Sequence, residues 1–235
     1  MLWEESWLRE AAPRQRTLWR GVEAQHRVAT MRLVDDLDEQ GVLEELLDAS
    51  KPPMSPGSQG AHYLVSTPFR YASPWPSRFR RPFELGAWYG AEETATVAAE
   101  TAYWRWRFLM DSDGLRDGQL ITELTFFQAR FVGVELDLMR APWAAHRAVW
   151  RHPEDYSHCH RLAVEVRRVQ PAIDAIRYES ARAPGGHCEV VFQPASLSVT
   201  RPVVQQTWAC KTTCTRVLLS HDDESHQFDM VAQSD

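Results

Sequence analysis

The segment 176–192, IRYESARAPGGHCEVVF, places a hydroxyl group, a guanidinium group and two adjacent glycines between two runs typical of β-strands. The residues concerned are Ser180, Arg182, Gly185 and Gly186. Two glycines allow the backbone to turn tightly and to adopt positive φ. A hydroxyl, an arginine and backbone N–H groups beside such a turn can hold an anionic ligand. The segment therefore predicts an anion-binding turn.

A second block, residues 67–107, brings arginines close to aromatic residues. Arg70 is followed by Tyr71, so a guanidinium that binds a phosphate would lie next to a ring that can stack on a planar ligand. A surface ion pair explains Arg70 at least as well. Arg78 begins a loop with three arginines, which could bind a pyrophosphate or simply remain solvated. Both interpretations stay open for each residue.

Glu100 is an acidic residue inside an alanine-rich stretch that predicts a helix over 94–108. A carboxylate among small apolar residues is costly to bury unless it is paired. Such a group is often either bound to an arginine, for example Arg107, or functional. A carboxylate beside a sugar can stabilise the positive charge that develops at the anomeric carbon. The residues alone leave the structural and the catalytic interpretation open.

Several familiar catalytic templates are absent from the sequence. The motifs GxGxxG after a strand, GxxxxGK[ST], HExxH and GxSxG do not occur. Their absence argues against a Rossmann dehydrogenase, a P-loop NTPase, a zincin and an α/β-hydrolase. The available His and Cys residues have poor spacing for zinc, because Cys210 and Cys214 in a strand would lie about 13 Å apart. The sequence predicts no bound metal.

The two blocks together resemble the RES-domain family, which comprises bacterial NAD-degrading toxins. In the first block the resemblance rests on Arg70, on Arg78 in an SRF-type turn, on Tyr89 and on Glu100. In the second block it rests on the stretch from Arg177 to Gly186. The matching region covers roughly residues 62 to 200.

The resemblance implies a fold related to ADP-ribosyltransferases, with NAD in a cleft between small sheets. It implies that the nicotinamide–ribose bond of NAD is cleaved by phosphate or water, as in an NAD phosphorylase or NAD glycohydrolase. NAD would be the substrate, no cofactor is expected, and inorganic phosphate is a possible co-substrate. The residues that it assigns to catalysis are Arg70, Glu100 and Ser180, and those that it assigns to NAD binding are Tyr71, Arg78, Tyr89, Tyr178, Arg182, Gly185 and Gly186.

The resemblance also implies a protein partner, an Xre-type antitoxin whose C-terminal segment blocks the cleft. Two other functions remain open at this point. One is a protein ADP-ribosyltransferase, which uses the same chemistry. The other is a catalytically silent module that binds a nucleotide or a partner.

The candidate site residues lie on both predicted helices and predicted strands, so we expect an α+β domain with mixed or antiparallel sheets around a cleft. Residues 1–50 predict helices, and the Pro/Gly/Ser-rich stretch 51–60 predicts a linker. We therefore divide the chain into an N-terminal helical extension with its linker, 1–60, and a RES-type catalytic domain, 61–235. Further helices are expected over 94–108 and 156–169, and strands over 63–71, 87–91, 120–130, 132–139, 175–180, 188–193 and 203–219.

The composition limits the class of protein. The chain has 235 residues, of which 44% are hydrophobic and 25% charged, and its net charge of −6 gives no general attraction to nucleic acid or anionic membranes. No apolar run approaches the ~20 residues of a membrane span, and the first ten residues lack the pattern of a signal peptide. We expect a cytoplasmic protein with reduced cysteines. The tryptophans of the N-terminal segment favour an interface, either in a homodimer or with the antitoxin.

Overall fold

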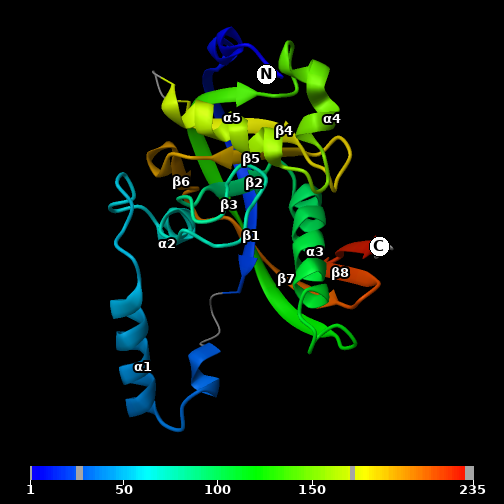
Figure 1. Ribbon diagram of the computed structural model, residues 1–235. Helices are drawn as coiled ribbons and strands as arrows, with labels where there is room; N and C mark the ends of the chain where they lie inside the picture. The colour runs from blue at the N-terminus through cyan, green and yellow to red at the C-terminus, as the bar shows by residue number, and fades with distance from the viewer. Residues whose placement is uncertain (1, 25–28, 170–172, 231–235) are drawn as a thin grey trace.

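The computed structural model describes residues 2–24, 29–169 and 173–230, and it shows an α+β fold in which one mixed sheet carries the helices on its faces (Figure 1). This confirms the predicted fold class. The strands are β1 (Ala12–Glu23), β2 (Trp88–Ala91), β3 (Leu120–Asp137), β4 (Ala175–Glu179), β5 (His187–Val191), β6 (Leu197–Val199), β7 (Gln205–Thr212), β8 (Arg216–His221) and β9 (Glu224–Asp229). The α-helices are α1 (Leu37–Ser50), α2 (Tyr63–Ser66), α3 (Thr94–Met110), α4 (Arg147–Trp150) and α5 (Ser157–Arg168), and the 3-10 helices are η1 (Glu5–Glu10), η2 (Ala29–Arg32), η3 (Thr67–Phe69), η4 (Trp143–His146) and η5 (Pro194–Ser196).

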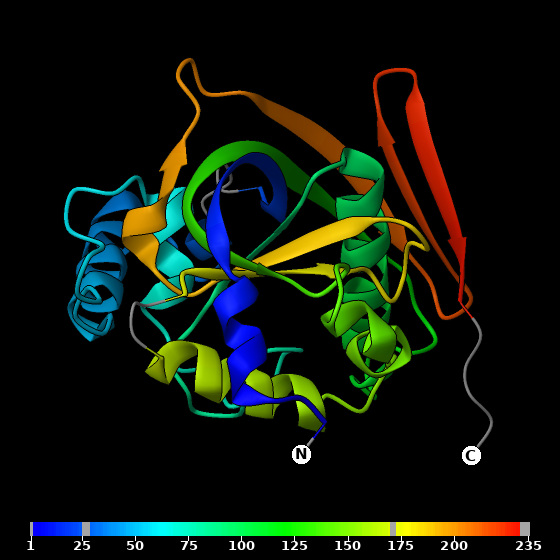
Figure 2. The same cartoon turned by 90° about the horizontal axis from the view of Figure 1, so that it is seen from above.

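Five of the strands pair in a closed ring. The pairing runs from β1 to β2, β5, β4 and β3, and β3 then pairs with β1 from Ala12↔Glu135 to Glu23↔Leu124. Only the contact between β3 and β4 is parallel. The first half of β3 also pairs with β7, and β7, β8 and β9, the orange and red strands at the upper right of Figure 2, extend the sheet from there. The long strand β3 therefore joins the ring to an antiparallel extension.

The interior of the ring contains one layer of apolar side chains and an adjacent layer of charged side chains. Leu18, Trp88, Phe131, Ala175 and Val191, one residue from each ring strand, are fully buried in one cluster. Side chains alternate along a strand, so the neighbours two positions away face the same interior. Several of these neighbours are charged, namely Arg16, Arg20, Arg177 and Glu189. Arg16 of β1 donates through Nε to a carboxylate oxygen of Glu135 in β3 at 2.5 Å. The interior of the ring thus contains ion pairs as well as a core.

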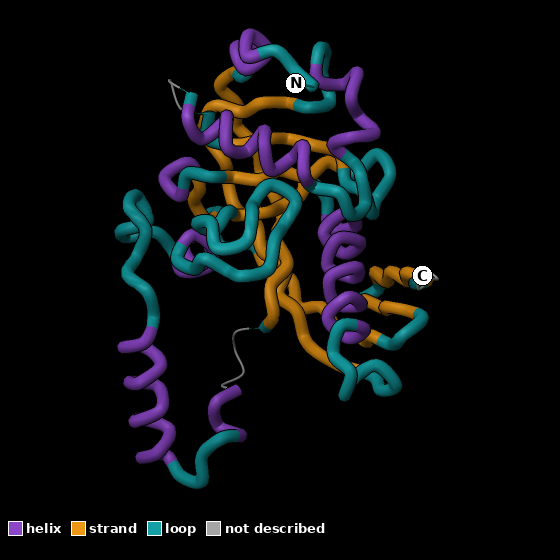
Figure 3. The backbone as a smooth tube through the Cα atoms, viewed as in Figure 1, coloured by secondary structure: helices purple, strands orange, loops and turns teal. Residues whose placement is uncertain are grey.

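A second core lies between the outer face of the sheet and the helices. Helix α3 packs against β1 and β8 through residues such as Val97 and Ala102. Helix α5 joins the same cluster through Leu162 and Val166. In Figure 3, α3 runs along the edge of the strands and α5 crosses them near the top. The two blocks of predicted site residues are carried by this layer and by the strands beneath it.

The prediction of an all-helical N-terminal segment is wrong for residues 12–23. These residues form β1, which belongs to the same sheet as the strands after residue 60. A half-buried strand usually alternates apolar inward-facing residues with polar outward-facing ones. The inward-facing positions of β1 include Arg16 and Arg20, so its sequence lacks this pattern and reads like a solvent-exposed segment. The helical prediction holds for α1, which Asp36 caps by accepting a hydrogen bond from the backbone N–H of Glu39 at 2.8 Å.

The prediction of a strand over 63–71 is also wrong, because these residues form α2 and η3. The side chain of His62 accepts a hydrogen bond from the backbone N–H of Leu64 and caps α2. Pro68, near the start of η3, has a fixed φ that suits a helical turn. Residues 120–130 and 132–139 were expected as two strands and form the single strand β3. The elements expected near 87–91, 94–108, 156–169, 175–180, 188–193 and 203–219 are present.

Helix α1 stands apart from the body of the molecule in Figures 1 and 3, and none of its residues is buried. The N-terminal tryptophans behave differently, because Trp3 is buried against Trp143 and Trp150 with ring centroids 6.1 and 5.9 Å away. Trp3 is therefore part of the core of this chain, and a homodimer stays a prediction. None of the helices in the described ranges is long and apolar enough to cross a bilayer.

Candidate active site

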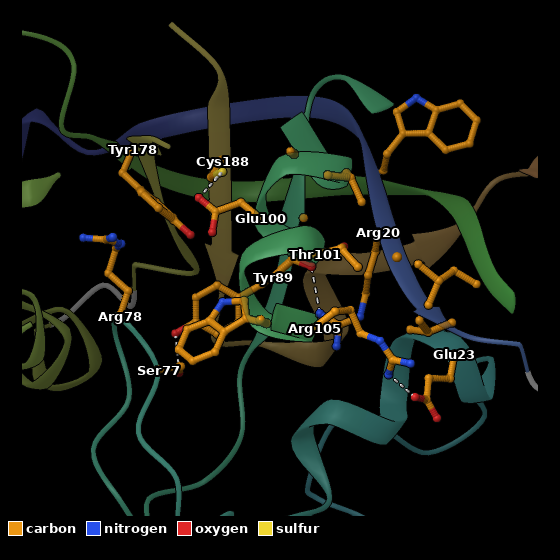
Figure 4. Close-up of a pocket in the computed structure, with 18 of the residues that line it drawn as sticks. Arg20, Glu23, Ser77, Arg78, Tyr89, Glu100, Thr101, Arg105, Tyr178 and Cys188 are labelled. Carbon is orange, nitrogen blue, oxygen red and sulfur yellow. Dashed lines mark hydrogen bonds and ion pairs between the residues drawn. The ribbon is translucent and has the colours of Figure 1, made fainter. Parts of the chain in front are cut away.

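A cavity lies where β1 and β2 separate. These two strands pair only at Trp19↔Ala91. The cavity has a volume of about 370 Å³ and is lined by five consecutive residues of β1, from Trp19 to Glu23, together with residues of β2 and α3 (Figure 4). Consecutive residues of a strand point to opposite faces, so five in a row can contact one cavity only if it lies beside the edge of the strand. The fork between β1 and β2 therefore forms the site.

Glu100 enters this cavity from α3, and Ser180 holds it in place. The Ser180 hydroxyl donates a hydrogen bond to Oε1 of Glu100 at 2.7 Å. The same hydroxyl accepts hydrogen bonds from the backbone N–H groups of Arg182 and Ala183 at 3.0 and 2.9 Å. Ser180 is fully buried and does not line the cavity. Because its one donor and two acceptor positions are occupied, Ser180 orients the carboxylate and has no capacity left for a ligand.

The Gly-Gly turn supports this arrangement from behind. Gly185 has a φ of +78°, and its N–H donates to Glu179. A Cβ atom at Gly186 would lie 2.5 Å from Oγ1 of Thr96 in α3, so the turn packs tightly against the helix that carries Glu100. Neither glycine lines the cavity. The turn predicted to bind an anion positions the serine and α3 instead.

Arg78 and Tyr178 form another wall of the cavity. Arg78 is buried, and its Nη1 donates to the carbonyl oxygens of Trp150 and His152 at 2.8 and 2.9 Å. The guanidinium also lies over the ring of Tyr156, 4.6 Å from the centroid. In Figure 4 the carboxylate of Glu100 points toward Tyr178 and Cys188. Arg78 thus supplies positive charge from a fixed position close to the carboxylate.

Arg20 is a candidate functional residue that the sequence interpretation missed. It projects from β1 into the fork, and its Nη1 donates to the backbone carbonyl of Tyr89 at 2.7 Å. Among the described residues its Nε has no hydrogen-bond partner, and no carboxylate oxygen lies within ion-pair distance of it. Burial lowers the pKa of Arg20 to about 10, so the guanidinium is still charged at neutral pH. A partly satisfied buried cation at a cavity wall is suited to bind an anion.

The signal that could have revealed Arg20 is the spacing within residues 14–22. Arg14, Arg16, Leu18, Arg20 and Val22 occupy alternate positions, and Pro13 and Gly21 disfavour a helix. Two of the positions between them carry the strand-favouring residues Thr17 and Trp19.

Comparison with known proteins places this geometry in a family. Residues 55–213 match the sequence model of the RES domain. The chain belongs to the RES-domain family. The predicted resemblance is therefore confirmed. The match begins after β1, so Arg20 comes from outside the matched region.

Two further comparisons were made. Among curated proteins, no significant match to the RES-domain chain exists. Among solved structures, it is similar to a chain in the crystal structure of the M. tuberculosis MbcT–MbcA toxin–antitoxin complex, with 11% sequence identity and a TM-score of 0.49. The alignment covers 89% of this chain and 92% of that chain.

The structure does not bring Arg70 together with Glu100 and Ser180 in the RES domain. Arg70 lies at the end of η3 and donates through Nε to the carbonyl of Pro52. It lines neither this cavity nor a second cavity that adjoins it and shares Arg20 and Tyr89. Of the three predicted catalytic residues, the structure therefore brings together Glu100 and Ser180 but not Arg70. The segment around Arg70 is a helical turn that directs its guanidinium toward the linker. Tyr71 also lies outside the cavity that contains Glu100 and lines the second one.

The remaining predicted residues of the RES domain fall into two groups. Tyr89 lines the cavity, and its hydroxyl hydrogen-bonds to Ser77 at 2.8 Å. Arg182 does not line the cavity, because its Nη2 donates to the carbonyl of Pro153 and its guanidinium lies over the ring of Tyr103. Arg182 contributes only its backbone N–H to the serine turn.

Cys188 also lines the cavity, beside Glu100. Burial raises the pKa of its thiol well above the ordinary value. A protonated thiol is a poor nucleophile, so the sulfur of Cys188 is not suited to nucleophilic attack.

Proposed function

We propose that the chain is an NAD-degrading toxin of the cytoplasm that cleaves the nicotinamide–ribose bond and is neutralised by an Xre-type antitoxin. The observation that carries the proposal is the state of Glu100. Ser180 fixes one of its carboxylate oxygens, while among the described residues nothing hydrogen-bonds the other oxygen, Oε2. A fixed carboxylate with one free oxygen in a cavity lined by arginines and tyrosines suits a ligand with phosphates, a sugar and a planar ring.

The proposed reaction breaks the bond between C1′ of the ribose and the ring nitrogen of nicotinamide. The electron pair of that bond moves to the nitrogen, so nicotinamide leaves as a neutral molecule. The ribose becomes oxocarbenium-like, and Glu100 stabilises the positive charge at C1′. An oxygen of water or phosphate then forms the new bond to C1′, and a water nucleophile passes its proton to Glu100 or to solvent.

Other residues would bind the substrate around the reacting bond. Arg20 has donors available for a phosphate oxygen, and Arg78 adds charge to the opposite wall. Tyr89 and Tyr178 offer aromatic surface to the nicotinamide ring. We therefore assign Arg20 and Glu100 to direct contact with substrate, and Ser180 to the positioning of Glu100. Arg70 has no place in this proposal.

The test of this activity is incubation of purified chain with NAD, with and without inorganic phosphate, followed by chromatography of the products. We expect release of nicotinamide, with ADP-ribose from hydrolysis or its phosphorylated form from phosphorolysis. Glu100→Gln should reduce the rate by about 10²–10³-fold. Glu93→Gln is the matched control, because Glu93 is an exposed glutamate at the start of the same helix and should retain the activity. Intact NAD after long incubation with folded, antitoxin-free protein would refute the proposal.

The toxin part of the proposal is tested in cells. Expression of the chain should deplete cellular NAD and arrest growth, and Glu100→Gln should do neither. Co-expression of an Xre-type protein from the adjacent gene should restore both NAD and growth. Arrest without loss of NAD would contradict the proposed link between activity and toxicity.

A further inference from the structure

A second cavity lies on the other side of the fork between β1 and β2. It has a volume of about 360 Å³ and is lined by α2, the loop after η3 and parts of both strands. Four residues line both cavities, namely Arg20, Val22, Ser77 and Tyr89. The two cavities are therefore neighbours with a common wall, and each is of a size typical for a small-molecule site, roughly 300–1,000 Å³.

The second cavity lies on one face of β1, whereas the first lies beside the edge of this strand. Arg20 and Val22 alternate with Trp19, Gly21 and Glu23 along β1, and only the first pair reaches the second cavity. The second cavity adds residues next to the core inside the ring, whereas the first adds residues of α3. Because β1 and β2 have separated at this level, the sheet is open between the two cavities.

The charges of the two cavities differ. The first contains Glu23 and Glu100 among its lining residues. The second is lined by two arginines and, among the described residues, by no carboxylate. One of these, Arg80, donates to the carbonyl oxygens of Ser73 and Trp75 and is already satisfied. Arg20 lies at the shared wall, and its Nε has no hydrogen-bond partner within the described part of the chain.

From this arrangement we propose that the second cavity is the subsite for the adenosine half of the dinucleotide, with Arg20 binding the pyrophosphate where the two cavities meet. This inference rests on the proposed function, which puts the nicotinamide ribose beside Glu100 in the first cavity. A dinucleotide consists of two nucleotide halves joined by an anionic pyrophosphate. Two cavities of similar volume with one buried guanidinium between them match that division.

The aromatic residues of the second cavity fit an adenine base. Tyr63 and Tyr71 line it and are 54% and 40% exposed, so their rings are accessible and not part of the core. Purine bases stack on aromatic side chains without any need for a preformed hydrogen-bond pattern. This assignment gives Tyr71 a role in binding the adenosine half, away from the reacting bond.

The experiment measures binding of ADP, which carries the adenosine half and the pyrophosphate but no bond that the enzyme cleaves. We expect Tyr63→Ala and Tyr71→Ala each to weaken ADP binding by about 5- to 150-fold, the range of base stacking on an aromatic residue. Trp75→Ala is the matched control, because Trp75 is 76% exposed in the same loop and lines neither cavity. All three side chains are at the surface, so the variants should fold.

Two comparisons separate the subsite from the catalytic proposal. Glu100→Gln should bind ADP as the natural chain does even though it releases no nicotinamide. Binding of nicotinamide mononucleotide should be altered less than twofold by Tyr71→Ala. If ADP does not bind, or binds the Tyr63→Ala/Tyr71→Ala double variant as tightly as the natural chain, the subsite is refuted. Failure of the ADP-binding test would not affect the catalytic proposal, which is decided separately by nicotinamide release from NAD in the natural chain.

Discussion

The role of Ser180 can be tested by replacing it with alanine. The hydroxyl makes three hydrogen bonds, one to Glu100 and two from the N–H groups of Arg182 and Ala183. An unsatisfied buried donor costs about 1–3 kcal/mol, and both N–H groups belong to half-buried residues. We therefore use the lower end of that range for each N–H group and expect Ser180→Ala to be destabilised by about 2 kcal/mol. A domain with a typical stability of about 5–15 kcal/mol remains folded after such a loss.

The effect on the reaction follows from the lost hydrogen bond to the carboxylate. A hydrogen bond to a charged group contributes about 1.5–3 kcal/mol. If this is fully expressed in the transition state, kcat for nicotinamide release falls by about 10- to 150-fold. The KM for NAD should change little, because Ser180 does not line the cavity.

A double-mutant cycle distinguishes positioning from direct contact. If Ser180 acts only through Glu100, then Ser180→Ala should change the rate less than about twofold when Glu100 is already glutamine. Urea unfolding of each variant checks that the comparison is made on folded protein. Independent losses that multiply in the double variant, or a raised KM for phosphate in Ser180→Ala, would refute the positioning role and return Ser180 to contact with a ligand.

Three further predictions concern stability and reactivity. The hydrogen bond from Arg147 lowers the pKa of Glu179 to about 2 from an ordinary 4.5. The ionised carboxylate therefore stabilises the folded chain fully above about pH 5, and this contribution is lost as the pH falls toward 2. In urea unfolding, the free energy of unfolding of Glu179→Gln should fall less steeply between pH 5 and pH 2 than that of the natural chain. Gly186→Ala should lower the free energy of unfolding by about 1–3 kcal/mol because of the clash with Thr96, and Thr96→Ala should recover part of it. A thiol reagent at pH 8 should modify Cys214 rapidly, because it is the exposed cysteine while the other three are buried; fast modification of a second thiol per native chain would contradict this arrangement.

Only the resemblance to the RES-domain family assigned Glu100 and Ser180 to one site, and the residues alone did not show that two positions 80 apart meet. The helix of Glu100 has a strong local signal in its alanine-rich stretch, and the turn after Ser180 has one in its two glycines. The purpose of the glycines was not predictable, since it depends on the contact between Gly186 and Thr96. A Gly-Gly pair has the same local signal whether a phosphate or a helix approaches it.

Arg70 shows the opposite case, in which a local pattern was misleading. The residues before it are aromatic or β-branched and favour a strand by composition. The backbone instead turns through α2 and η3, with Pro68 near the start of the second turn. A change from strand to helix alters the direction in which every side chain points. The guanidinium of Arg70 consequently reaches the linker and not the cavity.

The two arginines of β1 explain why charge pattern alone could not identify the binding residue. Arg16 and Arg20 are four positions apart in one strand and share its inner face. Arg16 is neutralised by Glu135 and by further carboxylates nearby, and the hydrogen bond that it donates to Glu135 raises its pKa. Arg20 has a backbone carbonyl as its partner, and burial lowers its pKa. Burying a cation without a counter-ion costs free energy, and a phosphate at the fork would supply the missing charge. The difference lies in residues more than 60 positions away in the sequence, so only the folded chain distinguishes the structural arginine from the one that is available to a ligand.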